Sequence, residues 1–159
     1  SLNKLILEPN TTIRNYELIS KLGEGTYGKI YSVNNLNTNK VQVLKILKND
    51  SSFLKSNLNE ISILKKIYEY HEKNYKDKNE YVSIILDNFF YKAHNIIVLK
   101  KYSKNLHEEQ KSNNFSGKQI RKIAFDILKG LDFLKNLTYT PEFRCYARTQ
   151  PTERLCCSG

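Results

Sequence analysis

The chain has 159 residues and a mass of 18.6 kDa, which is enough for one domain with a buried core. Apolar residues make up 40% of the sequence, and the absence of any apolar run of about 18 residues excludes a transmembrane helix. The net charge is +10, but the lysines are spread along the chain, without an arginine stripe or interleaved aromatic residues, so a nucleic-acid partner is not favoured. Because the codons of lysine and asparagine are rich in adenine, an AT-rich genome is another explanation for this positive charge.

The first elements predicted along the chain are three strands. Residues 16–22 have strand character, a glycine-rich segment follows, and residues 29–33 are again rich in β-branched and aromatic side chains. Polar residues 34–39 are typical of a hairpin connection, and residues 41–47 predict the third strand. This succession indicates an antiparallel sheet.

A helix and two more strands are expected next. Ser51 or Ser52 can cap the helix, and the polar stretch 71–79 ends it. Its apolar positions recur at helical spacing: Leu54, Leu58, Ile61, Leu64 and Tyr68. The two strands are predicted at 81–86, with an extension to Phe90 left open, and at 94–99.

A long amphipathic helix is the last predicted element, over residues 116–137. Ser116 can cap it, and Gln119 stands at the capping-box spacing. One face of this helix is apolar: Ile120, Ile123, Ala124, Ile127, Leu128, Leu131 and Leu134.

Residues 141–159 differ in composition from the rest of the chain. They contain no lysine and no asparagine, and they hold all three cysteines, Cys145, Cys156 and Cys157. The preceding residues therefore have no disulfide framework, and no metal site is expected. We expect this tail to be out-of-frame, vector-derived or intronic sequence.

The glycine-rich segment, Gly23-Glu-Gly-Thr-Tyr-Gly28, has the spacing G-x-G-x-x-G. Rossmann dinucleotide sites share this spacing, but there a helix follows, whereas residues 29–33 predict a strand. Glycines between two strands can form a flap whose backbone N–H groups approach phosphates, because no Cβ intervenes. A plain glycine-rich hairpin is the alternative.

Lys45 and Glu60 favour the phosphate-binding interpretation. Lys45 lies on a strand among apolar neighbours, where an ammonium group is costly without an anionic partner. Glu60 follows 15 residues later on the first helix. A strand lysine oriented by a helical glutamate is the pair that holds the α- and β-phosphates in kinases. An accidental lysine on an edge strand and a solvated glutamate are the alternative.

With these motifs, residues 16–137 resemble the N-terminal lobe of a eukaryotic protein kinase followed by the first long helix of its C-terminal lobe. The resemblance implies an α+β fold with a five-stranded antiparallel sheet and helix αC. It also implies ATP as cofactor, with Leu99 as gatekeeper and 100–102 as hinge. The residues expected at the nucleotide are Leu22, Gly23, Glu24, Gly25, Thr26, Tyr27, Gly28, Ile30, Val43, Lys45, Glu60, Leu99, Lys100 and Tyr102. Val43 stands where the family usually has alanine, and Lys100 where it usually has glutamate.

Within kinases the chain is most similar to the CMGC group, and there to LAMMER-type and related splicing-factor kinases. The similarity lies in residues 94–99, 120–127, 131–134 and 137–140. It implies a parent enzyme that phosphorylates Ser/Thr, with arginine-serine-rich splicing factors as candidate protein substrates.

The family's catalytic aspartate would follow Thr140, but Pro141 stands there, and Tyr139 takes the place of the family's histidine. No D-F-G motif follows, so no catalytic residue and no metal ligand is assigned, although the family uses Mg²⁺. We therefore expect the ATP-binding portion of a Ser/Thr kinase that does not itself turn over. A non-catalytic, pseudokinase-like binding module is the alternative.

The expected organisation has four parts. An N-terminal extension covers 1–15, the N-lobe and hinge cover 16–107, the start of the C-lobe covers 108–140, and the tail covers 141–159. Residues 1–10 lack the basic and apolar regions of a signal peptide, and no membrane partner is expected. We therefore expect a cytoplasmic or nuclear location.

Overall fold

A computed structural model of the chain describes residues 7–74 and 81–138. Contacts divide the chain into two units, Ser1–Phe115 and Ser116–Gly159, which are described separately. The tail beyond residue 138, including Tyr139 and Pro141, lies outside the described residues.

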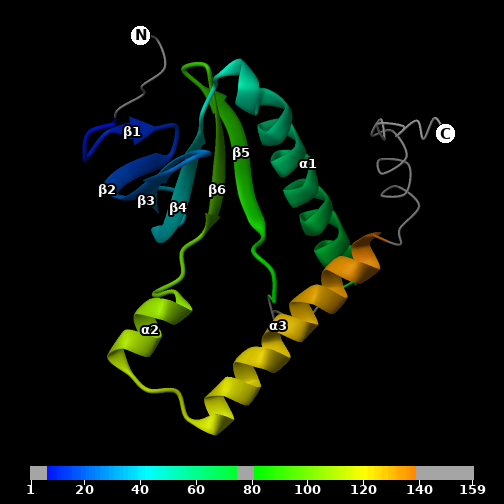
Figure 1. The fold of residues 1–159 in the computed structure, drawn as a ribbon. Helices are drawn as coiled ribbons and strands as arrows, with labels where there is room; N and C mark the ends of the chain where they lie inside the picture. The colour runs from blue at the N-terminus through cyan, green and yellow to red at the C-terminus, as the bar shows by residue number, and fades with distance from the viewer. Residues whose placement is uncertain (1–6, 75–80, 139–159) are drawn as a thin grey trace, which may run out of the picture. The chain divides into compact units, whose positions relative to one another are not determined.

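The first unit contains a six-stranded antiparallel sheet and two helices (Figure 1). The strands lie in the order β1-β2-β3-β4-β6-β5. Their bounds are β1 Thr12–Ile13, β2 Tyr16–Gly25, β3 Gly28–Asn35, β4 Lys40–Leu47, β5 Ile85–Tyr91 and β6 His94–Lys100. The α+β fold and the five predicted strands are confirmed, and the short strand β1 is additional.

The sheet is curled, which brings its two ends together. Tyr16 of β2 stacks on Phe89 of β5 with ring centroids 5.8 Å apart, and its hydroxyl donates a hydrogen bond of 2.9 Å to the Asp87 carboxylate. The guanidinium of Arg14 lies 4.2 Å from the centroid of the same Phe89 ring. These contacts join β5, at one end of the strand order, to β2 and the β1–β2 turn near the other end.

The main core covers the outer face of this sheet, the face turned away from helix α1. Alternate residues of β3, β4 and β6 point into it, as the period of two in a strand requires. Leu7 and Ile13, both within the expected N-terminal extension, are also buried there. The cluster comprises Leu7, Ile13, Tyr16, Leu18, Tyr31, Val33, Leu44, Ile46, Phe89, Ile96 and Val98.

Helix α1, Ser51–Asn74, runs alongside the sheet and packs on β5 (Figure 1). Ser51 is already helical, so the capping position falls on Asp50, whose carbonyl accepts a hydrogen bond of 2.9 Å from the Phe53 N–H. The prediction of Ser51 or Ser52 as the cap was therefore wrong. A second cluster joins this helix to the sheet. It comprises Leu47, Ile61, Ile85 and Ile97, with Leu64 and Leu99 packed against it.

The turn between β5 and β6 and the helix α2 are the remaining features described in the first unit. Strand β5 begins at Ile85, four residues later than predicted, and β6 follows a two-residue turn in which Lys92 and Ala93 both have positive φ, 43° and 65°. Helix α2, Leu106–Ser112, was not predicted. Asn105 caps it in a capping box with Glu108.

Helix α3, Gly117–Thr138, forms the described part of the second unit. The predicted capping box is present, because the Gln119 N–H donates to Ser116 Oγ at 3.3 Å and the Ser116 N–H donates to Gln119 Oε1 at 2.9 Å. Much of its apolar face is more than half exposed: Ile120, Phe125, Ile127, Leu128 and Leu131.

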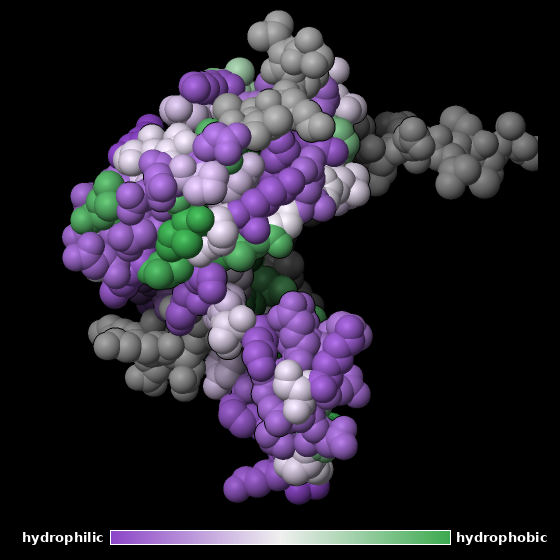
Figure 2. Space-filling view, turned by 90° about the vertical axis from the view of Figure 1, so that its left-hand side faces the viewer, coloured by the Kyte–Doolittle hydropathy of each residue, from purple (hydrophilic) through white to green (hydrophobic). Residues whose placement is uncertain are grey.

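On the face of the molecule shown in Figure 2, hydrophilic residues predominate and hydrophobic residues form small separate patches. None of the helices in the described part of the chain has the length and apolarity to cross a membrane.

Candidate functional site

The predicted pair of Lys45 and Glu60 is present. Lys45 Nζ lies 2.5 Å from Glu60 Oε1, and the two side chains are 21% and 33% exposed. Strand β4 places the lysine and helix α1 places the glutamate, 15 residues apart in sequence. Because β4 lies between β3 and β6 and the two side chains form an ion pair, the alternative of an accidental lysine on an edge strand and a solvated glutamate is wrong. The glutamate partly neutralises an ammonium group that is still accessible to a ligand.

Several predicted nucleotide residues share the face of the sheet that carries Lys45. Directly opposite residues of antiparallel strands point to the same face. Ile30 of β3 pairs with Lys45, and Val43 of β4 pairs with Leu99 of β6. The three apolar side chains are partly exposed. Together they form an apolar surface next to a cation, which suits a ligand with a flat ring and a phosphate chain.

The glycine flap, residues 23–28, is a hairpin between β2 and β3 rather than the start of a helix. Gly25 pairs with Gly28, so Thr26 and Tyr27 form the turn. No atom lies within 4 Å of the position that a Cβ would take at Gly23 or Gly25. The backbone at these two glycines is therefore open to a ligand.

Gly28 has a different role in the flap. A Cβ there would overlap the Ile46 carbonyl oxygen and lie 3.3 Å from the Leu47 Cα, and its φ is 158°. This glycine lets β3 approach β4 closely. The fold therefore requires a glycine at position 28, whatever ligand binds.

Three other predicted residues, Leu22, Lys100 and Tyr102, are exposed. Leu22 sits at an irregularity of the β2–β3 pairing and is 50% exposed. Lys100 ends β6, and its Nζ lies 5.8 Å from the ring centroid of Tyr102, which is 54% exposed. The side chains of Lys100 and Tyr102 are therefore both exposed at the predicted hinge, whose role in binding a base stays a prediction.

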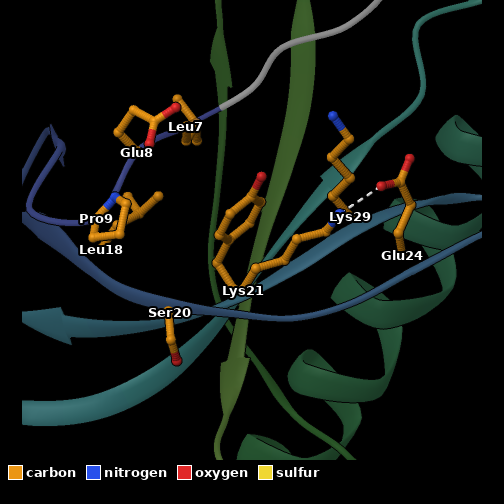
Figure 3. Close-up of a pocket in the computed structure, with 9 residues that line it drawn as sticks. Leu7, Glu8, Pro9, Leu18, Ser20, Lys21, Glu24 and Lys29 are labelled. Carbon is orange, nitrogen blue, oxygen red and sulfur yellow. Dashed lines mark hydrogen bonds and ion pairs between the residues drawn. The ribbon is translucent and has the colours of Figure 1, made fainter.

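The Glu24 side chain lies on the opposite face of the sheet. It forms an ion pair of 2.6 Å with Lys21 and lines a pocket of about 300 Å³ (Figure 3). This pocket also contains Tyr31, which alternates with Ile30 along β3 and so points away from Lys45. Its lining residues are Leu7, Glu8, Pro9, Leu18, Ser20, Lys21, Glu24, Lys29 and Tyr31. Only the Glu24 backbone can serve the nucleotide face.

The sequence reasoning missed a group of contacts around Lys48. The Tyr27 ring meets the Phe53 ring edge-on with centroids 6.1 Å apart, and Lys48 Nζ lies 5.5 Å from the Phe53 centroid. Asn57, one helical turn before Glu60, is only 2% exposed. An asparagine at a buried helical position was the signal that could have revealed this group.

Residues 7–74 and 81–138 contain no cluster of three or more His, Cys, Asp or Glu side chains able to hold a metal ion. The positions of the family's magnesium ligands would fall after Thr140, outside the described residues.

The Protein kinase domain family matches residues 16–138 of the chain. The chain belongs to the protein kinase family. The matched region corresponds to the N-terminal portion of the kinase domain, and the curled sheet with its helix α1 is the N-lobe.

Curated kinases are similar over most of this chain. The probable serine/threonine-protein kinase yakA of Dictyostelium discoideum is 33% identical over 81% of the chain and 9% of its own length. The dual specificity tyrosine-phosphorylation-regulated kinase 4 of Homo sapiens is 30% identical over 75% of the chain and 23% of its own length. The dual specificity protein kinase YAK1 of Saccharomyces cerevisiae is 30% identical over 77% of the chain and 15% of its own length. These relatives are kinases of the CMGC type, and the chain spans less than a quarter of each.

Proposed function

We propose that this kinase chain binds ATP on the face of the sheet that carries Lys45, as the ATP-binding portion of a Ser/Thr protein kinase. The observation that carries the proposal is the ion pair of 2.5 Å between Lys45 and Glu60. Kinases use this pair to hold the phosphates in line for transfer, and catalysis by these enzymes is mostly positioning and charge stabilisation.

Each part of the face has a task in this proposal. The open backbone at Gly23 and Gly25 approaches the phosphates, and the Lys45 ammonium attracts the α- and β-phosphates. Ile30 and Val43 contact the adenine ring. The segment that begins at Lys100 offers backbone groups to the edge of that ring. Mg²⁺, when bound with ATP, neutralises phosphate charge, and this chain's described residues supply no cluster to hold it.

Within the CMGC group, the relatives support kinases of the YAK and DYRK kinds. The LAMMER-type assignment, with arginine-serine-rich splicing factors as protein substrates, rests only on the motif resemblance at residues 94–99, 120–127, 131–134 and 137–140 and stays a prediction. So does the cytoplasmic or nuclear location.

We also propose that the chain with this sequence does not transfer phosphate. The sequence has Pro141 where the family has its catalytic aspartate and Tyr139 where the family has a histidine. Within the second unit, the described residues leave the apolar face of α3 uncovered, with Leu128 at 64% exposure, and such a face needs a cover. A non-catalytic binding module is the second candidate, favoured by an intact nucleotide pair without a catalytic aspartate. A phosphate-transfer assay on a basic protein substrate tests both, because turnover above background would contradict them.

Calorimetric titration with a non-hydrolysable ATP analogue tests the binding proposal. We expect Lys45→Met to weaken binding at least tenfold, because hydrogen bonds to charged groups contribute about 1.5–3 kcal/mol. Lys40→Met is the matched control, since it removes the same charge from an exposed position on the same strand. Equal affinity of the wild type and Lys45→Met would contradict the assignment.

A further inference from the structure

Asn57 of helix α1 is a buried polar residue that the nucleotide face does not use directly. Its side chain is 2% exposed, and Nδ2 donates a hydrogen bond of 2.6 Å to the Lys48 carbonyl oxygen. Its Oδ1 atom is buried and has no hydrogen-bond partner among the described residues. The unpaired buried oxygen lowers stability, whereas the hydrogen bond to the Lys48 carbonyl raises it.

The residue that Asn57 holds, Lys48, is also bound to the glycine flap. The Lys48 N–H donates to the Tyr27 carbonyl oxygen at 3.1 Å, while the Lys48 carbonyl accepts from Asn57. The Tyr27 ring meets Phe53 in the first turns of α1. The flap turn, the end of β4 and the start of α1 therefore meet at one residue.

The position of this junction relates it to the ion pair. Lys48 lies three residues after Lys45, and Asn57 lies three residues before Glu60. The Asn57–Lys48 hydrogen bond thus links helix α1 to the residue that directly follows β4, about one helical turn from the Lys45–Glu60 ion pair, which links α1 to β4 itself. A slide or rotation of α1 that breaks one contact would strain the other.

We infer that Asn57 is a positioning residue of the nucleotide site. By fixing the Lys48 backbone, it holds the glycine flap and helix α1 so that Gly25 and Lys45 act on the same phosphate chain. The inference rests on the proposed ATP binding. It assigns Asn57 no contact with the ligand.

The test compares Asn57→Leu with the wild type in the full chain. Leucine keeps the branched shape but cannot donate to the Lys48 carbonyl. Asn74→Leu is the matched control, because Asn74 lies on the same helix and donates a hydrogen bond of 2.9 Å to the Tyr70 carbonyl at an exposed site. Calorimetry measures the affinity for a non-hydrolysable ATP analogue and, separately, for adenosine.

We expect Asn57→Leu to bind the triphosphate about three- to tenfold more weakly, the range that one hydrogen bond supports. Adenosine affinity should change less than twofold, because the flap and Lys45 act on the phosphates. Hydrogen exchange of the Lys48 amide should accelerate in Asn57→Leu, since its bond to the Tyr27 carbonyl loosens. Asn74→Leu should leave all three quantities unchanged.

A second variant, Asn57→Ser, is too short to reach the Lys48 carbonyl and replaces Asn57→Leu if the latter does not fold. Equal triphosphate affinity of variant and wild type, or an equal loss for triphosphate and adenosine, would overturn the inference alone. Failure of the wild-type chain to bind the triphosphate would overturn the proposed function and, with it, this inference.

Discussion

The replacement Gly28→Ala tests whether the close approach of β3 to β4 is required by the fold. The new Cβ would lie 3.0 Å from the Ile46 carbonyl carbon and 3.3 Å from the Leu47 Cα, and closer still to the Ile46 oxygen. Carbon atoms in contact prefer about 3.5–4.0 Å. All three neighbours are backbone atoms, so no side chain can move aside and the strands themselves must separate.

We expect Gly28→Ala to lower the free energy of unfolding by about 2–4 kcal/mol. Overpacking costs about 1–3 kcal/mol, and an unfavourable backbone conformation, here φ 158°, adds a cost of the same order. A loss of this size is a large part of the roughly 5–15 kcal/mol that stabilises a domain. Urea denaturation followed by circular dichroism measures it as a shift of the midpoint.

Gly25→Ala is the control on the same flap. With no atom within 4 Å of its Cβ position, the change should leave stability unaltered or raise it by up to about 1 kcal/mol through the unfolded chain. The larger Gly25→Val should lose triphosphate affinity and keep adenosine affinity. The reasoning is refuted if Gly28→Ala unfolds within about 0.5 kcal/mol of the wild type, the usual range for neutral surface changes.

Three further predictions concern the ion pair, a buried tyrosine and a turn. Glu60→Gln and Lys45→Met should be non-additive in a double-mutant cycle of ATP-analogue affinity, and additive effects would contradict their coupling. Burial and the hydrogen bond to Asp87 raise the pKa of Tyr16 to about 12, above its ordinary value of 10.0. The free energy of unfolding should therefore decrease as the pH rises from 10 towards 12, because the unfolded chain loses this proton first. The decrease of the urea midpoint between pH 9 and pH 11 should be smaller in Tyr16→Phe than in the wild type. An equal decrease in both proteins would contradict the role of Tyr16 ionisation. Ala93→Gly should raise the urea midpoint by an amount worth up to about 1 kcal/mol, because Ala93 has φ 65°, and a lowered midpoint would speak against strain in this turn.

The sequence predicted those parts of the fold that local chemistry determines. A lysine among apolar strand residues needs an anion, which led to the Lys45–Glu60 pair now observed. Ser116 and Gln119 interact within one turn, so their capping box could be recognised from spacing.

The buried face of α1 could not be assigned from periodicity alone. Leu54, Leu58 and Tyr68 were predicted on the apolar stripe, but they are 45%, 61% and 44% exposed. Ile61 is buried as expected, together with the polar Asn57. Which stripe of a helix faces a sheet depends on the tertiary partner, and apolar residues occur on both stripes of this helix.

Strand β5 was placed too early for a related reason. The strand was predicted at 81–86, with an extension to Phe90 left open, whereas pairing with β6 fixes β5 at Ile85–Tyr91. The turn between these strands contains Lys92 and Ala93 in a conformation that usually requires glycine or asparagine. No turn signal in the sequence therefore marked the end of the strand.

The order of the strands has a consequence for the rate of folding. Strands β2, β3 and β4 are joined by short turns, so their pairing closes only small loops. The pairing of β4 with β6 brings Lys45 opposite Ile97, 52 residues further along the chain, with α1 in the intervening loop. Closing a long loop costs more conformational entropy than closing a short one, and non-local pairing slows folding. Strands β2, β3 and β4 can therefore form while the chain is still being synthesised, and β6 can join them only after about a third of the sequence has followed.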